Sequence, residues 1–198
     1  CPGTYTENVV VSKPIILQGN YEGTAGNEGS RVATDESIIR AATDAAPVVM
    51  VQANGVTIDG FQIDAETGGG VSSVGILIGN ASEGQSNVTV QNNIIENVGR
   101  EQIGGSIAGG ILGIDESPGS SPSVNNTIAA NWMRNFAPYD ETAGTQAGNA
   151  GIGLAGAFDA TVTNNVTSGV AFGVWLIAQG VGDQTISGGS HTGNHRGI

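Results

Sequence analysis

The segment Ala160-Thr161-Val162-Thr163-Asn164-Asn165 is the clearest copy of a short pattern that recurs along the chain. Every copy has the form x-Thr-(Ile/Val)-x-(Gly/Asn/Ala)-(Asn/Gly). Successive threonines are separated by 32, 38, 34 and 24 residues. A pattern of this period indicates a solenoid, in which the shortest unit has about 24 residues and the other units carry longer loops. The other copies are residues 56–60, 88–93, 126–131 and 184–189.

A second pattern lies between the copies of the first and begins with a glycine and an aliphatic residue. Two short strands are therefore expected in each unit, joined by turns rich in Gly, Ser, Asn, Asp and Pro. A unit this short cannot bury its own apolar side, so it must stack on its neighbours at the ~4.8 Å spacing of paired strands. The copies of the second pattern are residues 75–78, 110–113, 151–154, 173–176 and 197–198.

Three asparagines, Asn93, Asn131 and Asn165, end successive copies of the first pattern. In a stack of coils their side chains would lie above one another at the same corner. An asparagine tolerates the left-handed backbone of a tight corner, and its amide can bond the amides of the coils above and below. The spacing therefore predicts an asparagine ladder.

The start of the chain, Pro2-Gly3-Thr4-Tyr5-x-Glu7 followed by Ile15-Ile16-Leu17-Gln18-Gly19, resembles the opening coils of the pectin-lyase-like superfamily. Residues 56–63 resemble the next recurring segment of that family, and the asparagine coils resemble its generic repeat. The resemblance implies an all-β fold, a right-handed parallel β-helix (solenoid) of about six to seven coils. It implies no single function, because polysaccharide lyases, hydrolases, epimerases, tail spikes, adhesins and uncharacterised surface proteins share the fold.

We expect residues 1–198 to form a single β-helix domain that is a fragment of a longer solenoid. In the family the Pro-Gly-Thr-Tyr turn usually follows a strand, of which only Cys1 remains, and Gly197-Ile198 opens a further coil. The resemblance also implies an extracellular or cell-surface location, because proteins of this superfamily are usually found there.

The charge composition restricts the partners. Six basic residues against eighteen acidic ones give a formal net charge of −12, which leaves no basic cluster for nucleic acid or an anionic membrane. No apolar run is long enough to span a membrane. Cys1 permits no internal disulfide and, with only His191 and His195 available, no metal cluster of the cysteine–histidine type. Whether a glycan is attached stays open for the Asn-x-Ser/Thr triplets at Asn80, Asn87, Asn125 and Asn165.

Strand alternation predicts which side chains face outward. If the aliphatic residue after each glycine of the second pattern points inward, the next residue points outward, and none of these outward residues is charged. The same reasoning turns Trp132 outward, whereas a slip of one residue would bury it and expose Met133. Exposed apolar stripes are covered by the chain's own loops, pack against another molecule, or stack aromatic rings on sugars. The candidates for binding a partner or a glycan are Leu77, Leu112, Trp132, Tyr139 and Trp175.

Two adjacent acidic pairs lie in expected loops. Solvated loop charge and weak calcium binding through carboxylate and carbonyl oxygens are both open for them, and calcium is the only cofactor that the sequence suggests. The four residues are Asp115, Glu116, Asp140 and Glu141.

Three other titratable residues have structural explanations. Asp59 is expected to stabilise a corner by bonding nearby backbone amides. His191 and His195 are expected at corners or on the surface, because a histidine pair four residues apart binds metal readily only on a helix.

No catalytic residue is assigned. The Asp, Asn and His motifs of polygalacturonases and mannuronan epimerases are missing, and no arginine falls in an expected strand. We therefore expect a non-catalytic secreted or cell-surface module that packs on other protein subunits or domains of a surface assembly through apolar sheet faces. The alternative is a polysaccharide-active enzyme (lyase, hydrolase or epimerase) or a carbohydrate-binding adhesin of the same superfamily. An apolar outer face on the strands of Leu77, Leu112 and Trp175 favours assembly, and an open face lined by carboxylates favours catalysis.

Overall fold

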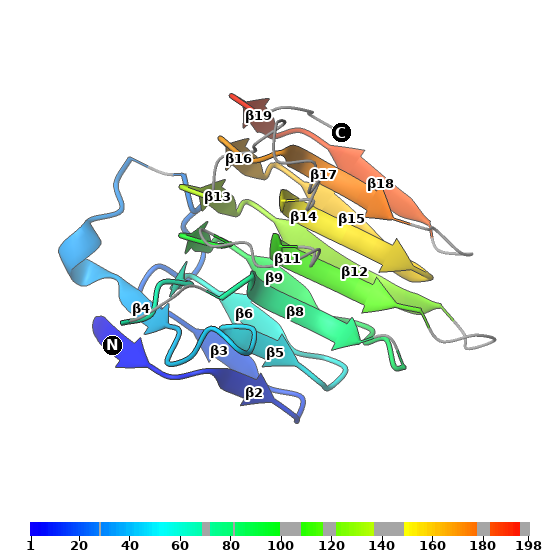
Figure 1. The fold of residues 1–198 in the computed structure, drawn as a ribbon, viewed down its shortest axis with the longest axis horizontal. Helices are drawn as coiled ribbons and strands as arrows, with labels where there is room; N and C mark the ends of the chain where they lie inside the picture. Colours follow the sequence, from blue (N-terminus) through cyan, green and yellow to red (C-terminus); the bar gives the residue numbers. More distant parts are fainter. Residues whose placement is uncertain are drawn as a thin grey trace.

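The computed structural model describes residues 1–27, 29–68, 72–80, 82–99, 108–116, 122–136, 149–177 and 183–194. Their strands form three parallel sheets, and in each sheet the strands stack in the order in which the chain makes them. Each coil contributes one strand to each sheet in turn, so the described chain makes six coils and the first strand of a seventh (Figure 1). The fold is a parallel β-helix, as the sequence predicted.

The sheets are called A, B and C in the order in which each coil visits them. Sheet A contains β1 (Gly3–Thr6), β4 (Ser37–Arg40), β7 (Gln62–Asp64), β10 (Ile94–Glu96), β13 (Trp132–Arg134), β16 (Val166–Ser168) and β19 (Ser190–Thr192). Sheet B contains β2 (Val9–Val11), β5 (Val49–Val51), β8 (Val74–Asn80), β11 (Ala108–Asp115), β14 (Asn149–Gly156) and β17 (Phe172–Ile177). Sheet C contains β3 (Ile16–Gln18), β6 (Thr57–Asp59), β9 (Thr89–Gln91), β12 (Ser123–Ala129), β15 (Phe158–Thr163) and β18 (Gln184–Ser187).

A short 3-10 helix, η1 (Ala33–Asp35), lies between the first and second coils. No helix in the described part of the chain is long and apolar enough to cross a membrane.

Each coil has three strands, whereas the two sequence patterns predicted two. The threonine pattern supplies a strand of sheet C and, beyond a sharp corner, a strand of sheet A. For example, β9 ends at Gln91 and β10 begins at Ile94. Because only two residues separate a strand of sheet C from the next strand of sheet A, the two strands form a single pattern in the sequence. The glycine–aliphatic pattern supplies sheet B.

The inward side chains of each sheet form continuous apolar rows. Burying one such side chain fully contributes roughly 1.5–3 kcal/mol, so these rows are the main source of stability for a stack whose coils are too short to fold alone. The rows include Ile58–Val90–Ile128–Val162 in sheet C, Ile76–Ile111–Ile152–Val174 in sheet B and Ile39–Ile63–Ile95–Met133 in sheet A, all buried and in register.

Asn93, Asn131 and Asn165 form the predicted ladder at the corner between sheets C and A. The Oδ1 of Asn131 accepts hydrogen bonds from the backbone N–H and the Nδ2 of Asn93, at 3.0 and 3.1 Å. The Oδ1 of Asn165 likewise accepts hydrogen bonds from the backbone N–H and the Nδ2 of Asn131, both at 3.0 Å. Asn93 in turn accepts the backbone N–H of Phe61. The three side chains are buried, and the ladder ties successive coils together.

The left-handed residue of each corner is the one before the ladder asparagine, not the ladder asparagine itself. Asn92, Ala130 and Asn164 have φ angles of 57°, 54° and 54°. The equivalent corners of the neighbouring coils use Gly60 and Gly188, with φ of 78° and 63°. The conformational part of the ladder prediction was therefore wrong by one position. The corner residue makes the turn, and the asparagine after it is buried in the ladder.

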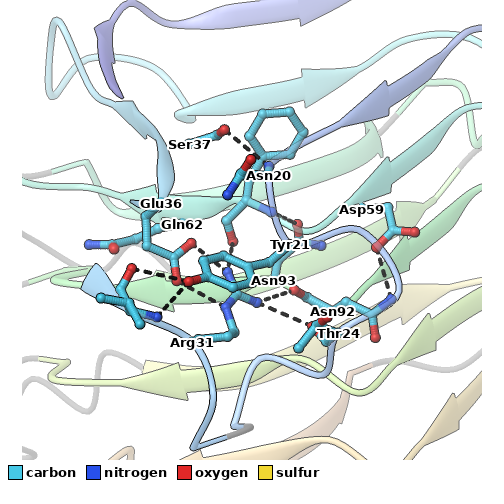
Figure 2. A network of polar contacts seen from close by, with 12 residues as sticks. Asn20, Tyr21, Thr24, Arg31, Glu36, Ser37, Asp59, Gln62, Asn92 and Asn93 are labelled. Atoms are coloured by element: carbon cyan, nitrogen blue, oxygen red, sulfur yellow. Dashed lines mark hydrogen bonds and ion pairs between the residues drawn. The ribbon is translucent and has the colours of Figure 1, made fainter. Parts of the chain in front are cut away.

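The connection after coil 1, here called the strap (described residues 19–27 and 29–36), lies against the outside of this corner. The backbone N–H of Gly26 bonds the carbonyl oxygen of Ala130, three coils away, at 2.9 Å. Arg31 donates to the carbonyl oxygen of Asn92 and forms a 2.6 Å ion pair with Glu36. The side chains of Arg31 and Glu36 are only 3% and 2% exposed, so the strap is held by a buried charge pair (Figure 2).

Candidate functional site on the outer sheet faces

The outer face of sheet B carries an apolar row. Val10 is 57% exposed, Met50, Leu77 and Trp175 are half-buried, and Leu112 is buried. None of the residues in the row is charged, as the sequence predicted. The apolar row consists of the equivalent outward residues of the six coils, which are Val10, Met50, Leu77, Leu112, Gly153 and Trp175.

A second outward row of sheet B is also apolar in coils 4 to 6, where Ile114, Ala155 and Ile177 are in register. The face is closely packed as well. A Cβ atom on Gly153 would lie 2.6 Å from Cδ2 of Leu112, so the leucine side chain occupies the space above the glycine. The ring of Trp175 stacks on that of Phe172 with centroids 4.7 Å apart.

The outer face of sheet A carries charges. Arg40, Asp64, Glu96 and Arg134 are in register in β4, β7, β10 and β13. The Nε of Arg40 lies 2.9 Å from Oδ2 of Asp64, and the Nε of Arg134 lies 2.8 Å from Oε2 of Glu96. The arginine side chains are 44% and 32% exposed, against 3% and 14% for the carboxylates, so cationic groups are outermost.

The expectation that no arginine lies in a strand was wrong. Arg40 and Arg134 are the last residues of β4 and β13. Their strands have only four and three residues, which is too short for alternation to show in the sequence.

Trp132 stands beside the charged row. Met133 is fully buried and Trp132 is half-buried, so alternation turns the tryptophan outward as predicted. The guanidinium carbon of Arg134 lies 4.4 Å from the centre of the Trp132 ring, and Gln62 donates to Oε1 of Glu96 at 2.6 Å. Gln62, Glu96, Trp132 and Arg134 thus form one connected polar and aromatic surface, called the Trp132 patch below.

The carboxylates of this surface are engaged by neighbouring side chains. Both oxygens of Glu96 accept hydrogen bonds, one from Gln62 and one from Arg134. The oxygens of Asp64 accept from Arg40 and from Asn97. Glycoside hydrolysis requires two carboxyl groups that face the scissile bond, and these two are engaged by neighbouring side chains.

Asp59 has the stabilising role that the sequence suggested. Its Oδ1 accepts hydrogen bonds from the backbone N–H of Gly23 in the strap and from Asn92 Nδ2, at 3.1 and 2.8 Å. Its Oδ2 accepts one from Gln91. Asp59 therefore connects the strap to the next coil.

The predicted calcium ligands are only partly described. Asp115 is buried, and its Oδ2 accepts hydrogen bonds from the backbone N–H and the Oγ of Ser123, at 3.0 and 2.8 Å. Glu116 is exposed. Within the described ranges, no three His, Cys, Asp or Glu side chains group closely enough to hold a metal ion. Tyr139, Asp140 and Glu141 lie outside the described residues, so the calcium and Tyr139 hypotheses stay predictions.

His191 lies within β19 and not at a corner, which was one of the two places expected for it. It is half-buried and continues the inward row of sheet A next to Thr167. Its Nδ1 lies 2.8 Å from Thr167 Oγ1, which also accepts a hydrogen bond from Asn194 Nδ2. Because the hydroxyl accepts from Asn194, its own hydrogen is available to a neutral Nδ1. Burial lowers the pKa of His191, in agreement with a neutral ring. His195 lies outside the described residues.

The four Asn-x-Ser/Thr triplets differ in accessibility. Asn87 and Asn125 are exposed and Asn80 is half-buried. Asn165 is buried in the ladder and donates its Nδ2 to the carbonyl oxygen of Ile128, so it cannot carry a glycan in the folded protein.

The first coil contains a hollow of about 280 Å³. Its lining includes Val9, Leu17, Ile39 and Phe61, and Glu7 is its only carboxylate. An apolar hollow with one acid lacks the pair of groups that acid–base chemistry on a glycan requires.

Comparisons with known proteins add no family. No family model matches the chain, and neither a curated protein nor a solved structure matches it. The fold and the outer faces define a parallel β-helix protein with an apolar face on sheet B and a polar and aromatic face on sheet A.

Proposed function

We propose that this protein is a non-catalytic secreted or cell-surface module that packs on partner subunits or neighbouring domains through the apolar row of sheet B. The observation that carries the proposal is the register of that row, which places an uncharged residue on the outer face of every coil, a glycine in coil 5 and an apolar side chain in the other five. Val10 is exposed and Met50, Leu77 and Trp175 are half-buried, and extended apolar patches on a protein surface commonly mark a contact with another molecule.

The chemistry of the other faces supports an assembly role. The buried carboxylates of sheet A are bound to arginines and amides, and Asp59 is bound to the strap. These acidic groups therefore stabilise the stack of coils. The apolar surface available for a partner is the outer face of sheet B. We also propose that the chain belongs to the pectin-lyase-like superfamily, which the opening motif at residues 2–19 and the parallel β-helix support.

A photo-crosslinking experiment tests the assembly role. A photoreactive side chain is placed at Leu77, in the apolar row, and at Val124 as a matched control, because Val124 is an exposed aliphatic residue on sheet C. In intact cells of the source organism we expect covalent adducts of defined mass from position 77 and few from position 124. Equal yields at both positions, or no adduct at either, would contradict the proposal.

Glycan binding at the Trp132 patch is the second candidate. An indole ring with an arginine over its face and a glutamate–glutamine pair beside it resembles the mixed aromatic and polar surfaces that hold sugar rings. Incubation with a panel of polysaccharides and calcium tests both binding and catalysis. Retention of the wild type and loss of retention in Trp132→Ala would favour a binder, whereas accumulation of unsaturated products, followed by absorbance, would overturn the non-catalytic assignment.

A further inference from the structure

The threonines that define the sequence repeat form a single row on the outer face of sheet C. They come from β6, β9, β12, β15 and β18, and each is paired in register with the next. Thr161 and Thr185 are exposed and the others are half-buried. Threonines that are 24 to 38 residues apart in the sequence therefore lie on one line in the structure. The members are Thr57, Thr89, Thr127, Thr161 and Thr185.

A second outward row runs parallel to the threonines, two residues further along each strand. In coils 3 to 6 the two rows together are here called the threonine face. None of its side chains is charged and none is larger than glutamine, in a chain with a net charge of −12. The threonine face consists of Thr89, Thr127, Thr161 and Thr185 with Gln91, Ala129, Thr163 and Ser187.

The face is held in a regular two-dimensional array. Parallel strands lie ~4.8 Å apart, and alternate residues of a strand lie roughly 6.6 Å apart. The register of β12 with β15 shifts between Ser123 and Asn126, but regular pairing resumes at Asn126, before Thr127, so the array is not interrupted. Buried Val90, Ile128 and Val162 hold the strands from the inside.

The chemistry of the array limits what it can recognise. The second row continues into Asp59 in coil 2, where the carboxylate accepts a hydrogen bond from Gln91. Within coils 3 to 6 the eight side chains of the face include no charge that could hold an ionic ligand and no aromatic ring that could stack on a sugar. The array presents hydroxyl and methyl groups at fixed intervals, each of which makes only a weak contact. Weak contacts add up to useful affinity when many are made at once by a partner with a matching repeat.

From this geometry we propose that the threonine face binds ice. The oxygen rows of an ice prism face are flat, uncharged and periodic, with a repeat close to the spacing of parallel strands. Threonine hydroxyls can hydrogen-bond to lattice waters, while the methyl groups between them order water in the gaps. The proposal concerns sheet C and is independent of the assembly role of sheet B.

Thermal hysteresis and partitioning into growing ice test the proposal. The wild type is expected to shape ice crystals, to separate the freezing and melting temperatures and to concentrate in the ice fraction. Thr127→Tyr, at the centre of the face, and Thr161→Tyr, at an exposed position, should each lose most of this activity. Thr4→Tyr is the matched control, because Thr4 is exposed on sheet A. Circular dichroism and melting curves verify that each variant is folded.

Several results would overturn the proposal. The first is a wild type without thermal hysteresis or ice partitioning, which would leave the row as a feature of sheet stability alone. A second is an equal loss in Thr4→Tyr and in the folded face variants. The third is wild-type protein that stays out of the ice but sediments with crystalline cellulose, with the same threonine variants abolishing that binding.

Discussion

The side-chain oxygen of Asn131 satisfies two donors of Asn93, the backbone N–H at 3.0 Å and the amide Nδ2 at 3.1 Å. The Nδ2 of Asn131 meanwhile donates to Asn165 and to the carbonyl oxygen of Val90. One side chain thus completes the hydrogen bonds of three successive coils. Because the site is buried, water cannot replace it.

Substitution of this ladder residue should be strongly destabilising. In Asn131→Ala the buried backbone N–H and Nδ2 of Asn93 lose their shared acceptor, and the carbonyl oxygen of Val90 loses the Nδ2 donor of Asn131. Each unsatisfied group costs about 1–3 kcal/mol, so we expect the free energy of unfolding to fall by about 3 kcal/mol or more. Urea denaturation measures it. Asn27→Ala, at an exposed position in the strap, is the control. A similar decrease in its free energy of unfolding would contradict the stabilising role assigned to the ladder.

The corner residue Ala130 offers a stabilising substitution. Its φ of 54° is unfavourable for alanine, whereas the equivalent corners carry asparagine or glycine. Replacement of an alanine by a residue that tolerates this conformation should gain roughly 1 kcal/mol. We expect Ala130→Asn and Ala130→Gly to raise the melting temperature. A lower melting temperature in both variants would contradict this account of the corner.

The buried ion pair of the strap should respond asymmetrically to mutation. Removal of one partner in Arg31→Met leaves Glu36 charged without its partner in a buried position, which typically costs 3–5 kcal/mol. The double variant Arg31→Met/Glu36→Leu should recover much of that loss. Arg40→Met is the control, because its pair is half-exposed and should contribute no more than about 1 kcal/mol. The rate of limited proteolysis within the strap should be highest for Arg31→Met, lower for the double variant and lowest for Arg40→Met. Equal rates for Arg31→Met and Arg40→Met would contradict the prediction.

Protonation of His191 in β19 should lower the stability of the protein in acid. Burial lowers the pKa of His191 below its ordinary value of 6.5, so the unfolded chain binds the proton more readily than the folded one. The contribution to stability is complete above pH 6.5 and decreases as the pH falls from there through the lowered pKa. Chemical denaturation at a series of pH values should show this slope in the wild type. His191→Gln should flatten it, and an unchanged slope would assign the effect to other groups.

The periodic parts of the fold could be predicted because similar side chains repeat at equivalent positions. The threonine copies located sheet C, and Asn93, Asn131 and Asn165 located the corner. Alternation also oriented Trp132 correctly. The same alternation within β19 turns His191 inward, next to Thr167.

The charged row of sheet A could not be predicted in the same way. Arg40 and Asp64 are neighbours only because β4 and β7 are adjacent, and they are 24 residues apart in the chain. The strap is a further case, because nothing periodic marks residues 19–36. Its path depends on isolated contacts, such as that of Gly26 with Ala130, which a repeat pattern does not encode.

That single contact changes how the stack can come apart. In a solenoid each coil touches only its neighbours, so the end coils can peel away one at a time and the rod unravels from a terminus. The strap fastens the first coil to the fourth, so coil 1 cannot peel off unless the tie to coil 4 is broken as well. The first four coils should accordingly open as one cooperative unit.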